Sequence, residues 1–159
     1  MRNRIIVFSV IAVLWCGFIF YLSSENSGQS SQRSSRVITK ICEIVDSDFP
    51  TYPEAKKAEI VNKYSFSVRK LAHFTAYAIL GALFFQVFCF VRKKKFRALF
   101  SIAASSLYAL SDEIHQSFSP GRSCEFRDVL IDTSGAALAV TISLLILCLH
   151  QRKRQRTVS

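Results

Sequence analysis

Residues 111–132 read SDEIHQSFSPGRSCEFRDVLID and separate two apolar stretches that are each long enough to cross a lipid bilayer. A chain that only anchors itself in a membrane needs no charged residues at such a position. Ionisable groups beside or inside a membrane span are costly, so they indicate a functional site by default. We therefore expect the rest of the chain to be arranged around this segment.

Four apolar stretches predict an all-α, polytopic membrane protein, folded as a four-helix transmembrane bundle in one domain over residues 1–159. Each stretch approaches or exceeds the roughly 20 residues that a helix needs to cross about 30 Å of hydrocarbon. The third is the least apolar, because it spans only if the helix carries Asp112, Glu113 and His115 with it. The predicted spans are about 5–22, 71–91, 96–118 and 129–149.

Positive charge is divided unevenly along the chain. Eleven Lys and Arg residues lie before the first span, between the second and third spans, and in the tail, with no Asp or Glu among them. All eleven acidic residues lie in the segments on the other side. The positive-inside rule then predicts a multi-pass cell-membrane protein with both termini in the cytoplasm. Nothing resembles a folded basic domain, so we do not expect nucleic-acid binding.

The predicted outer loop, residues 23–70, contains two short helical patterns. A Ser-rich linker at 29–35 precedes apolar residues at helical spacing in 37–45, which predicts a short amphipathic helix at the membrane interface or over the bundle mouth. Pro53 suits the first position of a second short helix, Glu54 to Asn62. A loop of this length favours a functional role over simple connection.

The five cysteines carry no metal-binding spacing, and we expect no metal or other cofactor. Cys42 and Cys124 fall on the same predicted side of the membrane and could pair in an oxidising compartment. Spacing alone does not decide between a disulfide and two free thiols.

One face of the second span is polar. Lys70, His73 and Tyr77 are three and four residues apart, so they share one side of a helix. Lys70 could instead reach the lipid headgroups, and a lone His is commonly a satisfied polar residue. Because three polar groups lie at one depth on one helix face, a functional site explains them about as well as these two structural alternatives.

Consecutive spans run in opposite directions, so the start of the second span, the end of the third and the start of the fourth all lie at the outer side of the membrane. Polar residues from these three segments are therefore expected at one depth. The carboxylate of Asp128 is also explained by its position in the first turn of a helix, whereas Asp132 should lie inside the apolar zone. Lys70, Arg122 or Arg127 could oppose the carboxylates, and such opposite charges would let these groups stay ionised. The candidate site residues are Lys70, His73, Tyr77, Asp112, Glu113, Gln116, Arg122, Asp128 and Asp132.

Such a pocket suits an amphiphile with an anionic head, which Arg and Lys side chains would clamp. His73 and the carboxylates could then perform acid–base chemistry. A structural polar network that holds four helices together would leave the same trace in the sequence, and both interpretations stay open at this point.

Four groups of residues resemble the VanZ-like family over nearly the whole chain. They are Trp15 with 20–24 (FYLSS), Lys70-x-x-His73-Phe74-x-x-Tyr77-x-x-Leu80-Gly81, Asp112-Glu113-x-x-Gln116-x-Phe118-x-Pro120-Gly121-Arg122, and Asp128-x-x-x-Asp132-x-x-Gly135. The resemblance implies a small bacterial membrane protein of about four helices, in a family named for a protein that gives low-level teicoplanin resistance. It implies no metal or catalytic residue. The family pattern commonly has Asn at the position of Asp132, where this chain departs from it.

Two functions therefore compete. In the first, the protein binds a cell-envelope amphiphile such as a membrane lipid, a lipid-linked precursor or a lipoglycopeptide, or changes access to it, and so contributes to teicoplanin resistance. In the second, it is a membrane-embedded enzyme acting on a lipid-linked or phosphorylated envelope substrate, although no serine lies in a nucleophile elbow. Solute transport would favour internal repeats and mid-membrane polar groups, which the sequence lacks.

Overall fold

The computed structural model describes residues 2–158, with side chains as far as Gln155, so that Met1, Ser159 and the side chains of residues 156–158 lie outside the described part. Within that range every regular element is helical, which confirms the predicted all-α class. The elements are α1 (Arg2–Ser23), α2 (Ser27–Val45), η1 (Phe49–Thr51), α3 (Glu54–Val87), η2 (Phe88–Phe90), α4 (Lys94–Gln116) and α5 (Phe126–Val158).

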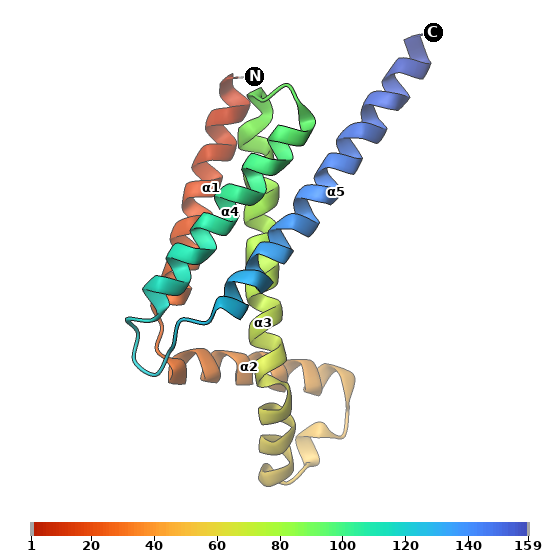
Figure 1. Cartoon of the computed structure of the whole chain (residues 1–159). Coiled ribbons are helices and arrows are strands. Elements are labelled where there is room, and N and C mark those ends of the chain that lie inside the picture. Colours follow the sequence, from red (N-terminus) through yellow and green to blue (C-terminus); the bar gives the residue numbers. More distant parts are fainter. Residues whose placement is uncertain (1, 159) are drawn as a thin grey trace.

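Helices α1, α3, α4 and α5 run along one another, and α2 crosses one end of this bundle (Figure 1). The start of α1, the turn between η2 and α4, and the end of α5 all lie at the opposite end. The three cationic segments of the sequence are therefore gathered at a single end of the molecule. Helix α2 and the loop between α4 and α5 define the other end.

Three of the helices are long and apolar enough to cross a membrane: Arg2–Ser23, Glu54–Phe90 and Phe126–Gln155. These contain the predicted first, second and fourth spans. The predicted third span, 96–118, falls largely on α4, whose average composition is too polar to place it in that group. Three candidate spans, and not four, are thus established by length and composition.

The buried face of α4 is nevertheless largely polar. Its buried positions recur every three or four residues and are mostly polar: Arg97, Ser101, Ser105, Ala109, Asp112, Glu113 and Gln116. Its exposed positions include Leu99, Phe100, Leu107, Leu110 and Ile114. This is the reverse of the pattern of a helix on a water-soluble protein, whose apolar stripe faces the core. It is typical of a helix whose outer surroundings are apolar.

Glycines bring α3 and α5 into close contact. A Cβ atom at Gly81 would lie 2.8 Å from the Cα of Ala136, and one at Gly135 would lie 2.2 Å from the carbonyl oxygen of Phe74. Small residues allow this approach, as is common where membrane helices pack. The two helices are therefore held at a fixed separation near the level of His73.

The structure corrects three details of the predicted outer loop. The Ser-rich segment 29–35 is helical and belongs to α2, because Asn26 and Gln29 form a capping box that starts the helix before it. The predicted helix Glu54–Asn62 is not separate, since α3 continues without a break to Val87. Pro53 is the N-cap residue of α3 and not its first helical residue.

The structure also decides between a Cys42–Cys124 disulfide and two free thiols. Cys42 and Cys124 are free, as are the other three cysteines.

We predict that Gly135→Ala lowers the free energy of unfolding by about 1–3 kcal/mol, because the new methyl group meets backbone atoms of α3 that cannot turn aside. Gly17→Ala is the matched control, since a Cβ at Gly17 has no atom within 4 Å. Thermal unfolding of the purified protein in detergent measures both. Equal melting temperatures for the two variants would contradict the close α3–α5 contact.

Candidate functional site

A chain of buried hydrogen bonds connects α1, α4 and the loop that follows α4. The hydroxyl of Ser23 donates to Asp112 Oδ2 at 2.9 Å, and Gln116 Nε2 donates to the same oxygen at 3.1 Å. Arg122 Nη1 donates to Gln116 Oε1 at 2.8 Å. Since Asp112 and Gln116 are one helical turn apart on the inner face of α4, the loop arginine is held in place by the helix it follows.

A histidine–carboxylate pair lies next to this chain, between α3 and α5. His73 Nδ1 is 3.6 Å from Asp132 Oδ2, and the side chain of Asp132 is only 2% exposed. The separation is longer than a normal hydrogen bond. The two side chains therefore lie close together without forming a hydrogen bond.

Three buried oxygen atoms at this level have no hydrogen-bond partner: the Tyr77 hydroxyl, Asp112 Oδ1 and Asp132 Oδ1. They come from α3, α4 and α5 respectively. More than nine-tenths of buried polar groups in proteins are satisfied. A cluster of unsatisfied oxygens at the junction of three helices is therefore unusual.

The remaining predicted residues form a second layer toward the helix ends. Lys70 makes an ion pair with Asp128, and both side chains are mostly buried. Glu113 Oε1 accepts a hydrogen bond at 2.8 Å from the backbone N–H of Glu125. These two contacts fix the start of α5 and the loop before it. Lys70 thus pairs with Asp128 and does not reach Asp112 or Asp132.

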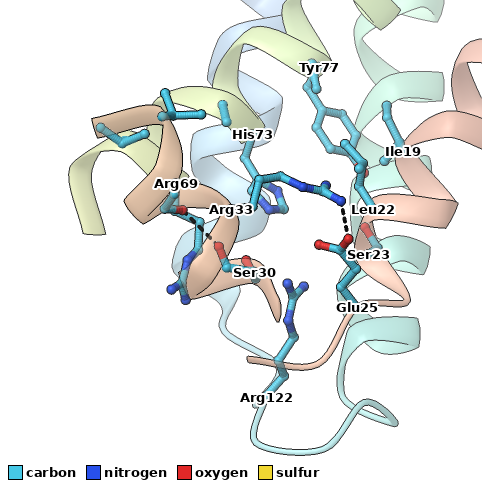
Figure 2. A pocket seen from close by; sticks show the side chains of 15 residues that line it. Ile19, Leu22, Ser23, Glu25, Ser30, Arg33, Arg69, His73, Tyr77 and Arg122 are labelled. Atoms are coloured by element: carbon cyan, nitrogen blue, oxygen red, sulfur yellow. Dashed lines mark hydrogen bonds and ion pairs between the residues drawn. The ribbon is translucent and has the colours of Figure 1, made fainter. Parts of the chain in front are cut away.

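Two cavities meet at the polar end of the bundle. The first, of about 170 Å³, is mostly apolar and lies between α1, α2 and α3, with Ile19, Leu22 and Val68 in its lining. The second, of about 240 Å³, lies between α3 and the α4–α5 loop. Three cationic or titratable residues line both: Arg69, His73 and Arg122. Figure 2 shows Arg122 rising from its loop toward His73.

The two shared arginines have no carboxylate partner. Neither forms an ion pair among residues 2–155, and Arg69 Nε is buried without a hydrogen-bond partner. Burial lowers the pKa of Arg122, and the neighbouring Arg69 guanidinium lowers it further. A guanidinium group carries a positive charge and only donates hydrogen bonds. Two cations held near each other are stabilised by a shared anion.

A third arginine is neutralised instead. Arg33 extends from α2 and pairs with Glu25, as Figure 2 shows. Arg33 therefore contributes to the wall of the first cavity without adding a free positive charge.

The arginine loop is fastened to the start of α2. Gly121 has a φ of 75°, and a Cβ there would lie 2.5 Å from Ser27 Oγ. The backbone N–H of Ser27 donates to the carbonyl of Pro120 at 3.3 Å. Glycine is needed at this turn for both its positive φ and its lack of a side chain.

Sequence reasoning missed two residues of the site. Ser23 is better explained from sequence as a helix cap, but it bonds to Asp112, and the neighbouring Ser24 makes the local bond to Phe20. Arg69 is four residues before His73, so helical spacing could have placed it on the same face. Arg127, an expected partner of the carboxylates, lies over the ring of Phe66 instead.

The arrangement offers anion binding and proton transfer. No group of three or more His, Cys, Asp and Glu side chains in the described residues could hold a metal ion. The two arginines can hold an anion, and His73 with Asp132 can accept or donate a proton beside it.

We predict that Ser23→Ala lowers the free energy of unfolding by about 1–3 kcal/mol, because Asp112 and Gln116 both lose a buried partner. Ser111→Ala is the control, since this exposed hydroxyl bonds only to the carbonyl of Tyr108 in its own helix. Chemical denaturation of both variants in detergent gives the comparison. A loss of the same size in Ser111→Ala would show that the α1–α4 bond adds nothing.

A family model described as VanZ/LLP1 matches residues 8–147, which is most of the chain. No curated protein and no solved structure matches it. The matched range contains all the residues that form the two cavities.

Proposed function

Because the chain belongs to the VanZ/LLP1 family, we propose that it is a multi-pass membrane protein that holds the anionic head of a cell-envelope amphiphile. The observation that carries this proposal is the pair Arg69 and Arg122, which line a mostly apolar cavity with no carboxylate partner of their own. A phosphate group accepts hydrogen bonds from both guanidinium groups in the geometry that arginine favours.

Apolar surfaces beside the arginines suit the hydrocarbon part of the same ligand. Ile19, Leu22 and Val68 line the first cavity next to Arg69 and Arg122. Helix α2 also exposes apolar side chains that nothing in the chain covers, including Ile44 at 84% and Val45 at 79%. An amphipathic helix of this kind lies in the plane of the lipid headgroups. A lipid could then enter the cavity sideways from the membrane.

All four bundle helices cross the membrane in this proposal, with both termini in the cytoplasm. The inward polar face and outward apolar face of α4 support its insertion, since its charges are covered by neighbouring helices. The cationic segments at the ends of α1, α3 and α5 support the orientation by the positive-inside rule. The two arginines then face the outer leaflet.

The ligand is an envelope lipid, a lipid-linked precursor or a lipoglycopeptide. Each combines an apolar chain with a polar head at the outer membrane face. Holding such a molecule, or changing access to it, would lower exposure to teicoplanin and contribute to resistance.

The topology has a direct test. We predict that a membrane-impermeant thiol reagent labels Cys124, which is exposed in the α4–α5 loop, on intact cells. Both measurements use chains in which the other native cysteines are replaced by Ser, because Cys42 lies on the same outer side as Cys124. A cysteine placed at Arg92 should then label only after the cells are opened, because α4 separates the two positions. Labelling of both positions from the same side would show that α4 does not cross.

Ligand binding is tested with a charge-matched pair of variants. We predict that Arg122→Gln weakens binding of fluorescent phosphatidic acid by about 10- to 100-fold, the loss of a charge-assisted hydrogen bond. Arg127→Gln removes the same charge from a side chain that lies over Phe66 and lines neither cavity. It should bind like the wild type.

Fluorescence polarisation of the purified protein in detergent micelles measures both, with labelled phosphatidylcholine as the ligand control. Equal weakening in the two variants would point to general charge attraction and reject the cavity as the binding site.

A second candidate function is enzymatic. The partly exposed His73, its carboxylate partner Asp132 and the unsatisfied oxygens beside them favour it, because binding alone does not require them.

A further inference from the structure

His73 is the titratable side chain best placed to act on a bound phosphate. It lines both cavities together with Arg69 and Arg122, and its side chain is 24% exposed while that of Asp132 is 2% exposed. A phosphate held by the two guanidinium groups would therefore lie beside the imidazole ring. The carboxylate partner would remain behind the ring, away from the ligand.

Asp132 determines which ring nitrogen can react. Its Oδ2 atom lies 3.6 Å from Nδ1 of His73, and a carboxylate on that side of the ring favours the proton on Nδ1 once the two groups bond. The other nitrogen, Nε2, then carries the lone pair. This is the relation between histidine and carboxylate that hydrolytic enzymes use to orient a general base.

The unsatisfied oxygens argue against a purely structural network. Asp112 Oδ1, Asp132 Oδ1 and the Tyr77 hydroxyl are buried, and each lacks a hydrogen bond. A network that served only to hold the helices together gains most when every member is satisfied. Of the three residues, Tyr77 lines the first cavity, so its hydroxyl is available there to a water molecule or a substrate.

We propose that the cavity is a hydrolytic centre for amphiphiles that end in a phosphate, with His73 as the general base. This inference rests on the proposed function, since the same two arginines must first hold the phosphate. The substrate class is an apolar chain ending in a phosphomonoester or a diphosphate.

The reaction balances without another reactant. Water attacks the terminal phosphorus and a new P–O bond forms, while Nε2 of His73 accepts the proton that the water loses. The bond between that phosphorus and the bridging oxygen breaks, and the bridging oxygen receives the proton back from His73. A monoester yields an alcohol and inorganic phosphate, and a diphosphate yields a monophosphate and inorganic phosphate. Arg69 and Arg122 stabilise the negative charge on the phosphoryl oxygens.

Each polar residue then has a distinct role. His73 is the catalytic residue, because it exchanges a proton with the reacting atoms. Asp132 is a positioning residue that acts through His73. Arg69 and Arg122 serve both binding and catalysis.

The test uses the full-length wild-type protein in detergent micelles with two probes, phosphatidic acid and farnesyl diphosphate. Released inorganic phosphate is measured by a colorimetric assay, and binding is measured in parallel. We expect release from at least one probe, and the probe identifies the kind of lipid. His73→Gln, which cannot act as a base, should lower release by about 10²-fold or more while binding changes little.

Thr75→Ala is the control on the same helix, because its exposed hydroxyl bonds only to the carbonyl of Leu71. It should release phosphate at the wild-type rate. His73→Gln protein purified in parallel also reports any contaminating phosphatase.

The pH dependence gives a second readout that needs no folded His73 variant. Release by the wild type should rise with pH through the range in which His73 loses its proton. The charged groups that face His73 are Asp132 of α5, Asp112 and Glu113 of α4, and Arg122 of the loop. Asp132→Asn should lower release and change the shape of this profile, which a merely structural role would not do.

The outcomes separate the two proposals. Binding without release of phosphate from either probe overturns the hydrolytic centre and leaves the binding function intact. Release that is unchanged in His73→Gln, or independent of pH, overturns the role of His73. Absence of binding to either probe overturns both proposals.

Discussion

The cover that α1, α3 and α5 provide for the polar face of α4 is the constraint on which the rest of the structure depends. Asp112, Glu113 and Gln116 are at most 5% exposed, and ionised groups are tolerated in an apolar environment only when they are paired or hydrogen-bonded. Ser23 supplies one partner from α1, and the loop after α4 supplies Arg122. The close glycine contacts between α3 and α5 keep His73 and Asp132 at the same level. Without this cover the charged side chains of α4 would lose the helices that bury them.

Periodicity and charge predicted much of this fold. The long apolar runs locate α1 to within a few residues at both ends, because hydrophobic length alone determines a candidate span. The predicted spans 71–91 and 129–149 fall on α3 (Glu54–Val87) and α5 (Phe126–Val158) but cover only part of each helix. Helix α4 was harder to judge, since its average composition hides the separation of polar and apolar faces. The outer segment was predicted worst. Its Ser-rich start is helical through a capping box, and the continuity of α3 across Asn62 has no local signal that distinguishes it from two helices.

The sequence placed the predicted polar residues near one another at one end of the bundle but did not determine their pairings. Spacing placed Lys70, His73 and Tyr77 on one face, and the structure has them there. It could not determine that Lys70 pairs with Asp128 while His73 faces Asp132, because pairing depends on how α3 and α5 rotate about their axes. For the same reason the sequence did not predict that Ser23 bonds to Asp112 or that Arg69 lines the cavities. In the structure, the Lys70–Asp128 and Glu113–Glu125 contacts are formed, whereas buried oxygens of Tyr77, Asp112 and Asp132 have no hydrogen bond. No sequence pattern distinguishes these two sets of residues.

The turn at Gly121 has a mechanical consequence. Pro120 is hydrogen-bonded to Ser27 at the start of α2, and Arg122 is two residues away from that bond. If α2 tilts to open the proposed lateral entry to the first cavity, it would therefore also pull on the α4–α5 loop that carries Arg122. Ligand entry and binding of its charged group by Arg122 would then be coupled through one movement of α2, with the turn at Gly121 as the hinge.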